Sequence, residues 1–171
     1  MSEAEVGIIM GSTSDLAIME EASRVLDSFG IGYDITISSG HRSPERTIAY
    51  ATSASQRGIK VIIVGAGAAA HLAGTIAALT TLPVIGVPIH SYSSPLGGLD
   101  SLLSTVQMPS GVPVATMAVG QAGAKNAAIL AAQILALSNT DLAAKLASYK
   151  EQMEQEVVRA AEEALQNRPS S

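Results

Sequence analysis

The sequence predicts an α/β protein with a doubly wound parallel sheet in three layers, followed by a long C-terminal helix. Two observations indicate the sheet: short apolar runs recur between residues 6 and 119, and helix-like segments separate them. A third observation concerns the tail, which is polar from Asp141 onward and repeats apolar residues three and four positions apart. We expect a single domain over residues 1–171, with a core over about 6–137 and an oligomerisation helix over about 139–166.

The first half of the chain predicts two strand–helix units of a flavodoxin-like or Rossmann-like fold. Each unit begins with an apolar run and continues into a helix with an apolar stripe. Gly30 and Gly58 are placed to end the two helices, and Pro44 suits a first helical turn because its φ is already fixed. The expected elements of this half cover residues 6–10, 15–28, 33–38 and 44–57.

The second half predicts three more strands. Residues 61–89 carry no formal charge and are long enough to span a bilayer, but glycine and proline divide the run. We interpret it as two buried strands around a small-residue helix, with the second strand closed by Pro88. A loop over residues 90–98 follows. The expected strands of this half are 60–64, 84–87 and 114–119, and the expected helices are about 72–80, 99–105, 125–137 and 141–166.

The composition limits the possible partners. Charged residues make up 15% of the chain, below the roughly 25% of ordinary globular domains, which indicates a surface partly buried in a homo-oligomer. The net charge of −5 gives no reason to expect nucleic acid binding. The absence of cysteine excludes disulfides, thiol nucleophiles and cysteine-ligated metals. The polar N-terminus lacks the layout of a signal peptide, so we expect a cytoplasmic protein with no membrane segment.

Two polar loops follow the first two predicted strands. They are Gly11-Ser12-Thr13-Ser14-Asp15 and Ser38-Ser39-Gly40-His41-Arg42-Ser43-Pro44. Because ligands bind outside the carboxyl ends of strands in an open parallel sheet, both loops should lie on one rim. Together they offer hydroxyls, a carboxylate, an arginine and a histidine, which suits a phosphorylated sugar and a proton transfer.

The first loop has the parts of an anion site. Gly11 lets the backbone approach a ligand, and the start of a helix presents free N–H groups. Asp15 is placed to accept hydrogen bonds from ribose hydroxyls. The alternative is structural, with Ser14 or Asp15 capping the helix by accepting from its first free N–H groups.

The second loop carries His41 beside Arg42. Histidine gives and takes protons near neutral pH, and the planar fork of arginine holds phosphate or carboxylate. The alternative is an ordinary histidine of a surface loop.

A third segment, from Gly65 to His71, partly matches a dinucleotide-binding fingerprint. It lacks the third glycine at the required spacing, so NAD binding is not expected. We expect instead a thin loop through which the backbone and His71 reach a flat ring, or a His71 that is structural. His90 lies in a loop with less support and is not assigned to the site.

No metal or serine nucleophile is expected. The histidines do not pair with carboxylates at the spacing of metal ligands, and no serine stands in a nucleophile elbow.

Four segments of the chain form an ordered set. They are Met10-Gly11-Ser12-x-Ser14-Asp15, Ser39-Gly40-His41-Arg42-Ser43-Pro44, Gly65-Ala66-Gly67-Ala68-Ala69-Ala70-His71-Leu72-Ala73-Gly74 and Asp100-Ser101-Leu102-Leu103-Ser104-x-Val106-Gln107-Met108-Pro109. The set resembles the class I N5-carboxyaminoimidazole ribonucleotide mutases of purine biosynthesis (the phosphoribosylaminoimidazole carboxylase catalytic subunit family), over about residues 6–137. The chain departs from the family pattern at Gly40, Ser43, Ala68 and Ala73, and in a longer segment over residues 90–96.

The resemblance implies an isomerase that moves a carboxylate from the exocyclic nitrogen of N5-carboxyaminoimidazole ribonucleotide to ring carbon four, without metal or organic cofactor. His41 is the implied acid/base. The implied substrate contacts are Ser12 and Asp15 to the phosphoribosyl group, Arg42 to the phosphate, Ser39 and Gly40 to the carboxylate, and Ser14, Gly67, Ala70, His71 and Leu72 elsewhere on the substrate. The resemblance also implies a homo-octamer whose subunits exchange C-terminal helices.

Two alternatives stay open. The class II relatives carboxylate aminoimidazole ribonucleotide directly with CO₂, although Arg42 and the Gly-Ala-Gly loop favour class I. The other alternative is a non-catalytic nucleotide-binding module, in which replacing His41 would change affinity alone.

Overall fold

Five parallel strands form one sheet in the order β2-β1-β3-β4-β5, which is the order of a flavodoxin-like doubly wound fold. The computed structural model describes residues 3–92 and 94–166. The strands are β1 (Val6–Met10), β2 (Tyr33–Ile37), β3 (Val61–Gly67), β4 (Val84–Ile89) and β5 (Ala115–Thr116). Val6 of β1 pairs with Tyr33 on one side and with Val61 on the other. The predicted fold class is confirmed.

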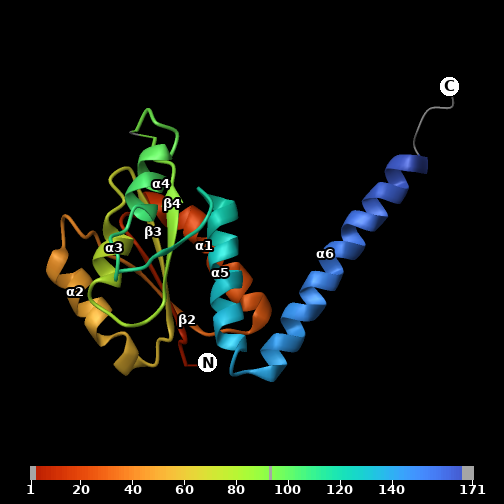
Figure 1. The fold of residues 1–171 in the computed structure, drawn as a ribbon, viewed down its shortest axis with the longest axis horizontal. Helices are drawn as coiled ribbons and strands as arrows, with labels where there is room; N and C mark the ends of the chain where they lie inside the picture. The colour runs from red at the N-terminus through yellow and green to blue at the C-terminus, as the bar shows by residue number, and fades with distance from the viewer. Residues whose placement is uncertain (1–2, 93, 167–171) are drawn as a thin grey trace. The chain divides into compact units, whose positions relative to one another are not determined.

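Helices cover both faces of this sheet (Figure 1). Helices α2 (Pro44–Ser53) and α3 (Leu72–Ala77) lie on one face, and α1 (Leu16–Phe29) and α5 (Gln121–Ala136) lie on the other. The remaining helices are α4 (Leu99–Val106), α6 (Thr140–Gln166) and the short 3₁₀ turns η1 (Thr13–Asp15) and η2 (Ser55–Arg57).

Alternation along the strands supplies a core to each face. Ile9, Ile62 and Val64 are buried on the α2–α3 face, in a cluster with Leu72 and Ile76 of α3. Neighbouring strand residues point to the opposite face because the side-chain period of a strand is two. On that face α1 packs so closely that a Cβ on Gly65 would overlap the Met19 side chain. Glycine at position 65 therefore leaves room for Met19 against the sheet.

Several predicted boundaries were wrong. Gly65 and Gly67 belong to β3 rather than to a loop, and Pro88 lies inside β4, opposite Ala66. The predicted helix over 72–80 is only α3, and the predicted strand over 114–119 is only β5, whereas α5 begins earlier than expected, at Gln121. The predicted loop over residues 90–98 includes Ser93, which lies outside the described residues.

Two glycines end helices as predicted, but the predicted cap does not form. Gly30 and Gly58 adopt φ angles of 74° and 88°, in the left-handed region that glycine tolerates. Asp15 stands at the N-cap of α1 without a capping hydrogen bond. The capping side chain is Ser12, whose Oγ accepts from the Ser14 N–H at 3.3 Å, because the 3₁₀ turn η1 precedes the helix.

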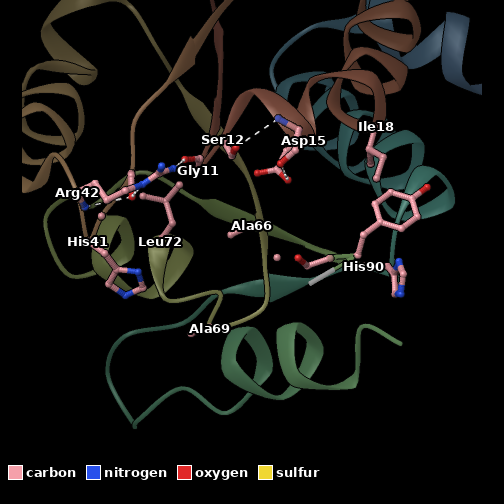
Figure 2. Close-up of a pocket in the computed structure, with 16 residues that line it drawn as sticks. Gly11, Ser12, Asp15, Ile18, His41, Arg42, Ala66, Ala69, Leu72 and His90 are labelled. Atoms are coloured by element: carbon pink, nitrogen blue, oxygen red, sulfur yellow. Dashed lines mark hydrogen bonds between the residues drawn. The ribbon is translucent and has the colours of Figure 1, made fainter. Parts of the chain in front are cut away.

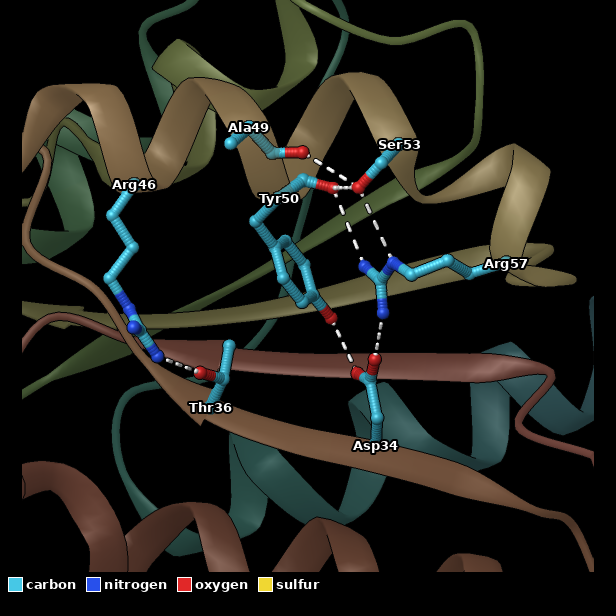
Figure 3. A network of polar contacts seen from close by, with 7 residues as sticks. All are labelled: Asp34, Thr36, Arg46, Ala49, Tyr50, Ser53 and Arg57. Atoms are coloured by element: carbon cyan, nitrogen blue, oxygen red, sulfur yellow. Dashed lines mark hydrogen bonds and ion pairs between the residues drawn. The ribbon is translucent and has the colours of Figure 1, made fainter.

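A polar network joins the edge strand β2 to α2 and η2 (Figure 3). The Tyr50 hydroxyl donates to Asp34 Oδ1 at 2.6 Å, and Arg57 pairs with the other carboxylate oxygen. The Arg57 guanidinium also lies 4.6 Å from the centroid of the Tyr50 ring. Burial, reinforced by the neighbouring Asp34 carboxylate, raises the pKa of Tyr50, so its phenol stays protonated and keeps donating.

The chain divides into two compact units, residues 1–134 and 135–171. The first unit holds the sheet and the loops at its rim. The second unit contains α6. At the start of this helix the Asn139 side chain accepts a hydrogen bond from the Leu142 N–H at 3.0 Å, which caps the first turn. Every residue from 150 to 166 is exposed, including Met153 and Val157 of the predicted apolar stripe.

The uncharged run at residues 61–89 forms β3, α3 and β4, as predicted. Across the described ranges, no helix combines the length and the apolar character needed to cross a membrane.

Candidate active site

A cavity of about 570 Å³ opens at the carboxyl ends of β1, β2, β3 and β4 (Figure 2). The two predicted loops form much of its wall, together with the end of β3 and the start of α3. Its lining residues are Gly11, Ser12, Ser14, Asp15, Ile18, Ser39, Gly40, His41, Arg42, Ala66, Gly67, Ala69, Leu72, His90, Ser91 and Tyr92. Of the residues predicted for the site, Ala70 and His71 are absent from this lining.

Asp15 is the buried carboxylate of the cavity. The residue is 7% exposed, and its side chain is directed toward the cavity (Figure 2). Burial raises the pKa of the Asp15 carboxyl, while hydrogen bonds from the Ser14 hydroxyl and the Ser12 backbone oppose the rise. A carboxylate in this position is well placed to accept hydrogen bonds from a ligand's hydroxyl groups.

The second loop is a closed turn held by its own serines. Ser43 Oγ accepts from the Ser39 N–H at 3.0 Å and lies 3.1 Å from the Ser39 carbonyl oxygen, to which it donates. Ser38 shares a buried hydrogen bond of 2.8 Å with Thr47 of α2. The turn is therefore anchored on α2 by hydrogen bonds within the protein.

Arg42 joins the two predicted loops. Its guanidinium donates to the Gly11 carbonyl oxygen at 3.2 Å and to Ser39 Oγ at 3.4 Å. Since the side chain is exposed and has further N–H groups, it can bind an anion while it keeps these contacts.

His41 extends from this turn and meets His71. Its Nε2 lies 3.1 Å from His71 Nδ1, and the two rings are edge to face, with centroids 5.2 Å apart at 87°. His71 stands at the N-cap of α3 but makes no capping hydrogen bond with its side chain. The ring of His71 therefore contacts His41 and does not cap α3.

The loop between β3 and α3 contains a strained residue. Ala68 has a φ of 52°, in the region that favours glycine. Ser104 of α4 supports this loop. Its Oγ accepts from the Ala70 N–H at 3.0 Å and lies 3.3 Å from the Ala68 carbonyl oxygen.

His90 lies at the end of the cavity away from His41 (Figure 2). Tyr92 also lines the cavity, and sequence reasoning assigned neither residue. Their rings are edge to face, with centroids 5.5 Å apart. The sequence could have predicted His90 as a site residue, because it directly follows β4. The rule that places ligands at the carboxyl ends of parallel strands applies to it as it does to the other two loops.

The cavity brings together side chains that can act as acid and base, bind an anion and bind hydroxyl groups. Within residues 3–92 and 94–166, no three histidine or acidic side chains lie close enough together to hold a metal ion. The groups present can bind a phosphorylated sugar and move a proton on the attached ring.

Comparisons with known proteins agree with this chemistry. A family model described as AIR carboxylase matches residues 5–156. The N5-carboxyaminoimidazole ribonucleotide mutase of Thermotoga maritima is 57% identical over 157 residues, covering 92% of this chain and 90% of that protein. The mutase of Pyrococcus horikoshii is 59% identical over 152 residues, covering 89% and 84%. The crystal structure of Treponema denticola PurE superposes with a TM-score of 0.82 at 30% identity, covering 92% of this chain and 96% of that one.

Proposed function

Because this chain belongs to the AIR carboxylase family, we propose that His41 is the acid/base of a carboxylate transfer carried out in the cavity. The chain is an isomerase of purine biosynthesis. It converts N5-carboxyaminoimidazole ribonucleotide to 4-carboxy-5-aminoimidazole ribonucleotide, the activity for which its relatives are named.

The cavity suggests how the substrate is held. Arg42 binds the phosphate, and Ser12, Ser14 and Asp15 bind the ribose. Ser39 Oγ accepts from Arg42, so its own proton is available to the migrating carboxylate. Gly40, Gly67 and Leu72 enclose the ring, with Ala70 fixing the loop behind it.

The reaction then needs two proton transfers, one to the exocyclic nitrogen and one from ring carbon four. His41 protonates the exocyclic nitrogen as the bond from nitrogen to the carboxyl carbon breaks, and the bonding electrons stay on nitrogen. The released CO₂ remains in the cavity and is attacked by ring carbon four. His41 then takes the proton from that carbon, which restores the aromatic ring. Holding CO₂ beside the ring replaces a dilute encounter with an intramolecular one, which lowers the barrier by up to several kcal/mol.

One observation carries this proposal: His41 lines the same cavity as the Ser12–Asp15 turn and Arg42. A histidine far from that turn could not reach the ring of a ribonucleotide whose sugar is bound by Asp15.

The test is the variant His41→Asn, which keeps a polar side chain but cannot exchange a proton. We expect kcat to fall by at least about a hundredfold, the usual contribution of a general acid/base, while the substrate still binds. Calorimetry measures the binding and spectrophotometry measures the turnover.

The assay is run in parallel with aminoimidazole ribonucleotide and bicarbonate. A wild-type preference for that pair would assign the class II reaction instead. Unchanged kcat in His41→Asn would remove this histidine from the mechanism, and an absence of turnover in the wild type would leave a nucleotide-binding module.

For the quaternary structure, we propose a cytoplasmic homo-octamer of single-domain subunits, in which the helix over about residues 139–166 packs on a neighbouring subunit. The low charge content and the exposed apolar residues of α6 support this proposal.

A further inference from the structure

The contact between His41 and His71 has no part in the mechanism described so far. We propose that His71 positions His41 and stores the proton that His41 delivers, which deepens the proposed function and rests on it. In this arrangement His41 works on the substrate through Nδ1, because its Nε2 is held by His71.

Both rings project from backbone that is held by hydrogen bonds within the protein. The His71 N–H donates to the Ala69 carbonyl oxygen at 2.8 Å, and the His71 carbonyl oxygen accepts from the Thr75 N–H at 2.9 Å. The preceding Ala70 N–H is held by Ser104 Oγ. On the other side, the Ser39–Ser43 turn fixes the backbone that carries His41. The 3.1 Å contact therefore joins two loops, each of which is held by its own hydrogen bonds.

A hydrogen bond between two ring nitrogens requires a single proton between them. A neutral imidazole has one N–H, so whichever ring donates determines the state of the other ring. If His71 Nδ1 donates, His41 carries its own proton on Nδ1 and is ready to act as an acid. If His41 Nε2 donates, its Nδ1 is bare and ready to act as a base.

The two states are the beginning and the middle of the reaction. At the start the pair holds one proton beyond neutrality, with N–H groups at His41 Nδ1, His71 Nδ1 and His71 Nε2. When His41 Nδ1 protonates the substrate nitrogen, the His71 Nδ1 proton moves to His41 Nε2, and both rings are then neutral. When His41 Nδ1 takes the proton from ring carbon four, its Nε2 proton returns to His71. The cycle closes with no net gain or loss of protons.

The contact also restricts what His71 itself does. The resemblance implied His71 as a substrate contact, but its Nδ1 is occupied by His41 and the residue is absent from the cavity lining. We therefore assign His71 as a positioning residue that acts through His41.

The test uses the fact that the chain has three histidines. In protein labelled with ¹⁵N at histidine, each ring can be assigned by comparison with the variants His41→Asn, His71→Asn and His90→Asn. We expect a ¹⁵N–¹⁵N coupling across the hydrogen bond between His41 Nε2 and His71 Nδ1 in the wild type. The ring nitrogens of His41 should shift in His71→Ala, while those of His90 stay in place.

Kinetics separate positioning from proton storage. His71→Ala should lower kcat by about ten- to a hundredfold, as expected for a misplaced reacting group, with KM changed less than about threefold. His71→Asn places an amide where Nδ1 stood, so it should restore the His41 nitrogen shifts but not kcat, because an amide stores no proton.

Each result decides between alternatives. Unchanged His41 signals in His71→Ala, or the absence of the coupling, would overturn the positioning role. Full kcat in His71→Asn would overturn proton storage. Retained turnover in His41→Asn would refute the proposed acid/base function instead, and the ring-to-ring coupling would be unaffected by that outcome.

Discussion

Asp15 is a buried acid at the start of α1, and its burial affects stability as well as the binding role proposed for it. Burial raises its folded-state pKa above the value of 3.8 expected in an unfolded chain, so the folded protein holds the proton more tightly. The stabilising contribution of this group is therefore complete below pH 3.8 and is lost as pH rises through the folded-state pKa. Above that point the ionised carboxylate opposes folding.

We expect Asp15→Asn to raise Tm at pH 8 relative to the wild type, with the gain shrinking as pH falls toward 4. The amide removes the buried charge that opposes folding. The same change should raise KM by roughly ten- to a hundredfold, the loss expected for a hydrogen bond to a charged group. Calorimetric scans across pH and steady-state kinetics measure the two effects.

The control is Asp27→Asn, which makes the same charge change at an exposed position of α1. It should leave KM unchanged and give no gain in Tm that depends on pH in this way. A lower Tm for Asp15→Asn at pH 8 would contradict the assignment of Asp15 as a buried charge that opposes folding.

At this scale the sequence predicted which residues line the cavity better than it predicted their contacts. Ser12, His41 and Arg42 were predicted because the carboxyl ends of parallel strands share one edge. The approach of His41 to His71 was not predicted, because the two residues lie 30 positions apart and meet only through the geometry of two loops. The roles of these residues in catalysis stay predictions.

Among the elements, β4 shows why the boundaries were harder to predict than the fold. Pro88 was expected to end the strand, since proline cannot donate a hydrogen bond to a ladder. Its carbonyl oxygen accepts from the Gly120 N–H at 2.9 Å, so its nitrogen faces the side where β5 has already ended at Thr116. The missing N–H has no strand partner to lose there, and β4 continues to Ile89.

The loop between β3 and α3 gives a prediction about stability. Ala68→Gly removes a Cβ from a residue in the left-handed region, which relieves about 1–2 kcal/mol of backbone strain in the folded state. Glycine also makes the unfolded chain more flexible, which lowers the free energy of unfolding by about 0.4–1 kcal/mol. We expect a net gain of about 0.5–1 kcal/mol in the free energy of unfolding. Thermal melting should show a Tm higher by about 1–4 °C.

Ala69→Gly is the matched control. Ala69 is the neighbouring loop residue, is exposed and is not among the non-glycine residues of positive φ, so only the cost of the freer unfolded chain applies. It should lower Tm slightly. Equal shifts in the two variants would show that Ala68 is not strained.

For the whole molecule, the exposed stripe of α6 gives the test of assembly. Val157 is 69% exposed in the isolated chain, and every residue of α6 from 150 to 166 is exposed. If α6 packs on a neighbour, Val157→Glu places a charge in an apolar interface, which is unfavourable unless the charge is paired. We expect native mass spectrometry to give an octamer for the wild type and smaller species for this variant.

Gln155→Glu introduces the same charge on the opposite side of α6 and should leave the octamer intact. A wild-type monomer at micromolar concentration, or an unchanged octamer in Val157→Glu, would contradict the proposed packing of α6.

Ser104 connects α4 to the role proposed for His71. None of the α4 residues is among the described lining of the cavity, yet one hydroxyl holds the segment from which His71 reaches its partner ring. If His71 positions His41 as proposed, the reaction rate can be altered from outside the cavity, without any change in how tightly the ribonucleotide is bound. If cells were selected for growth in the presence of a competitive inhibitor of this enzyme, we would expect compensating substitutions on α4 as well as in the residues that line the cavity.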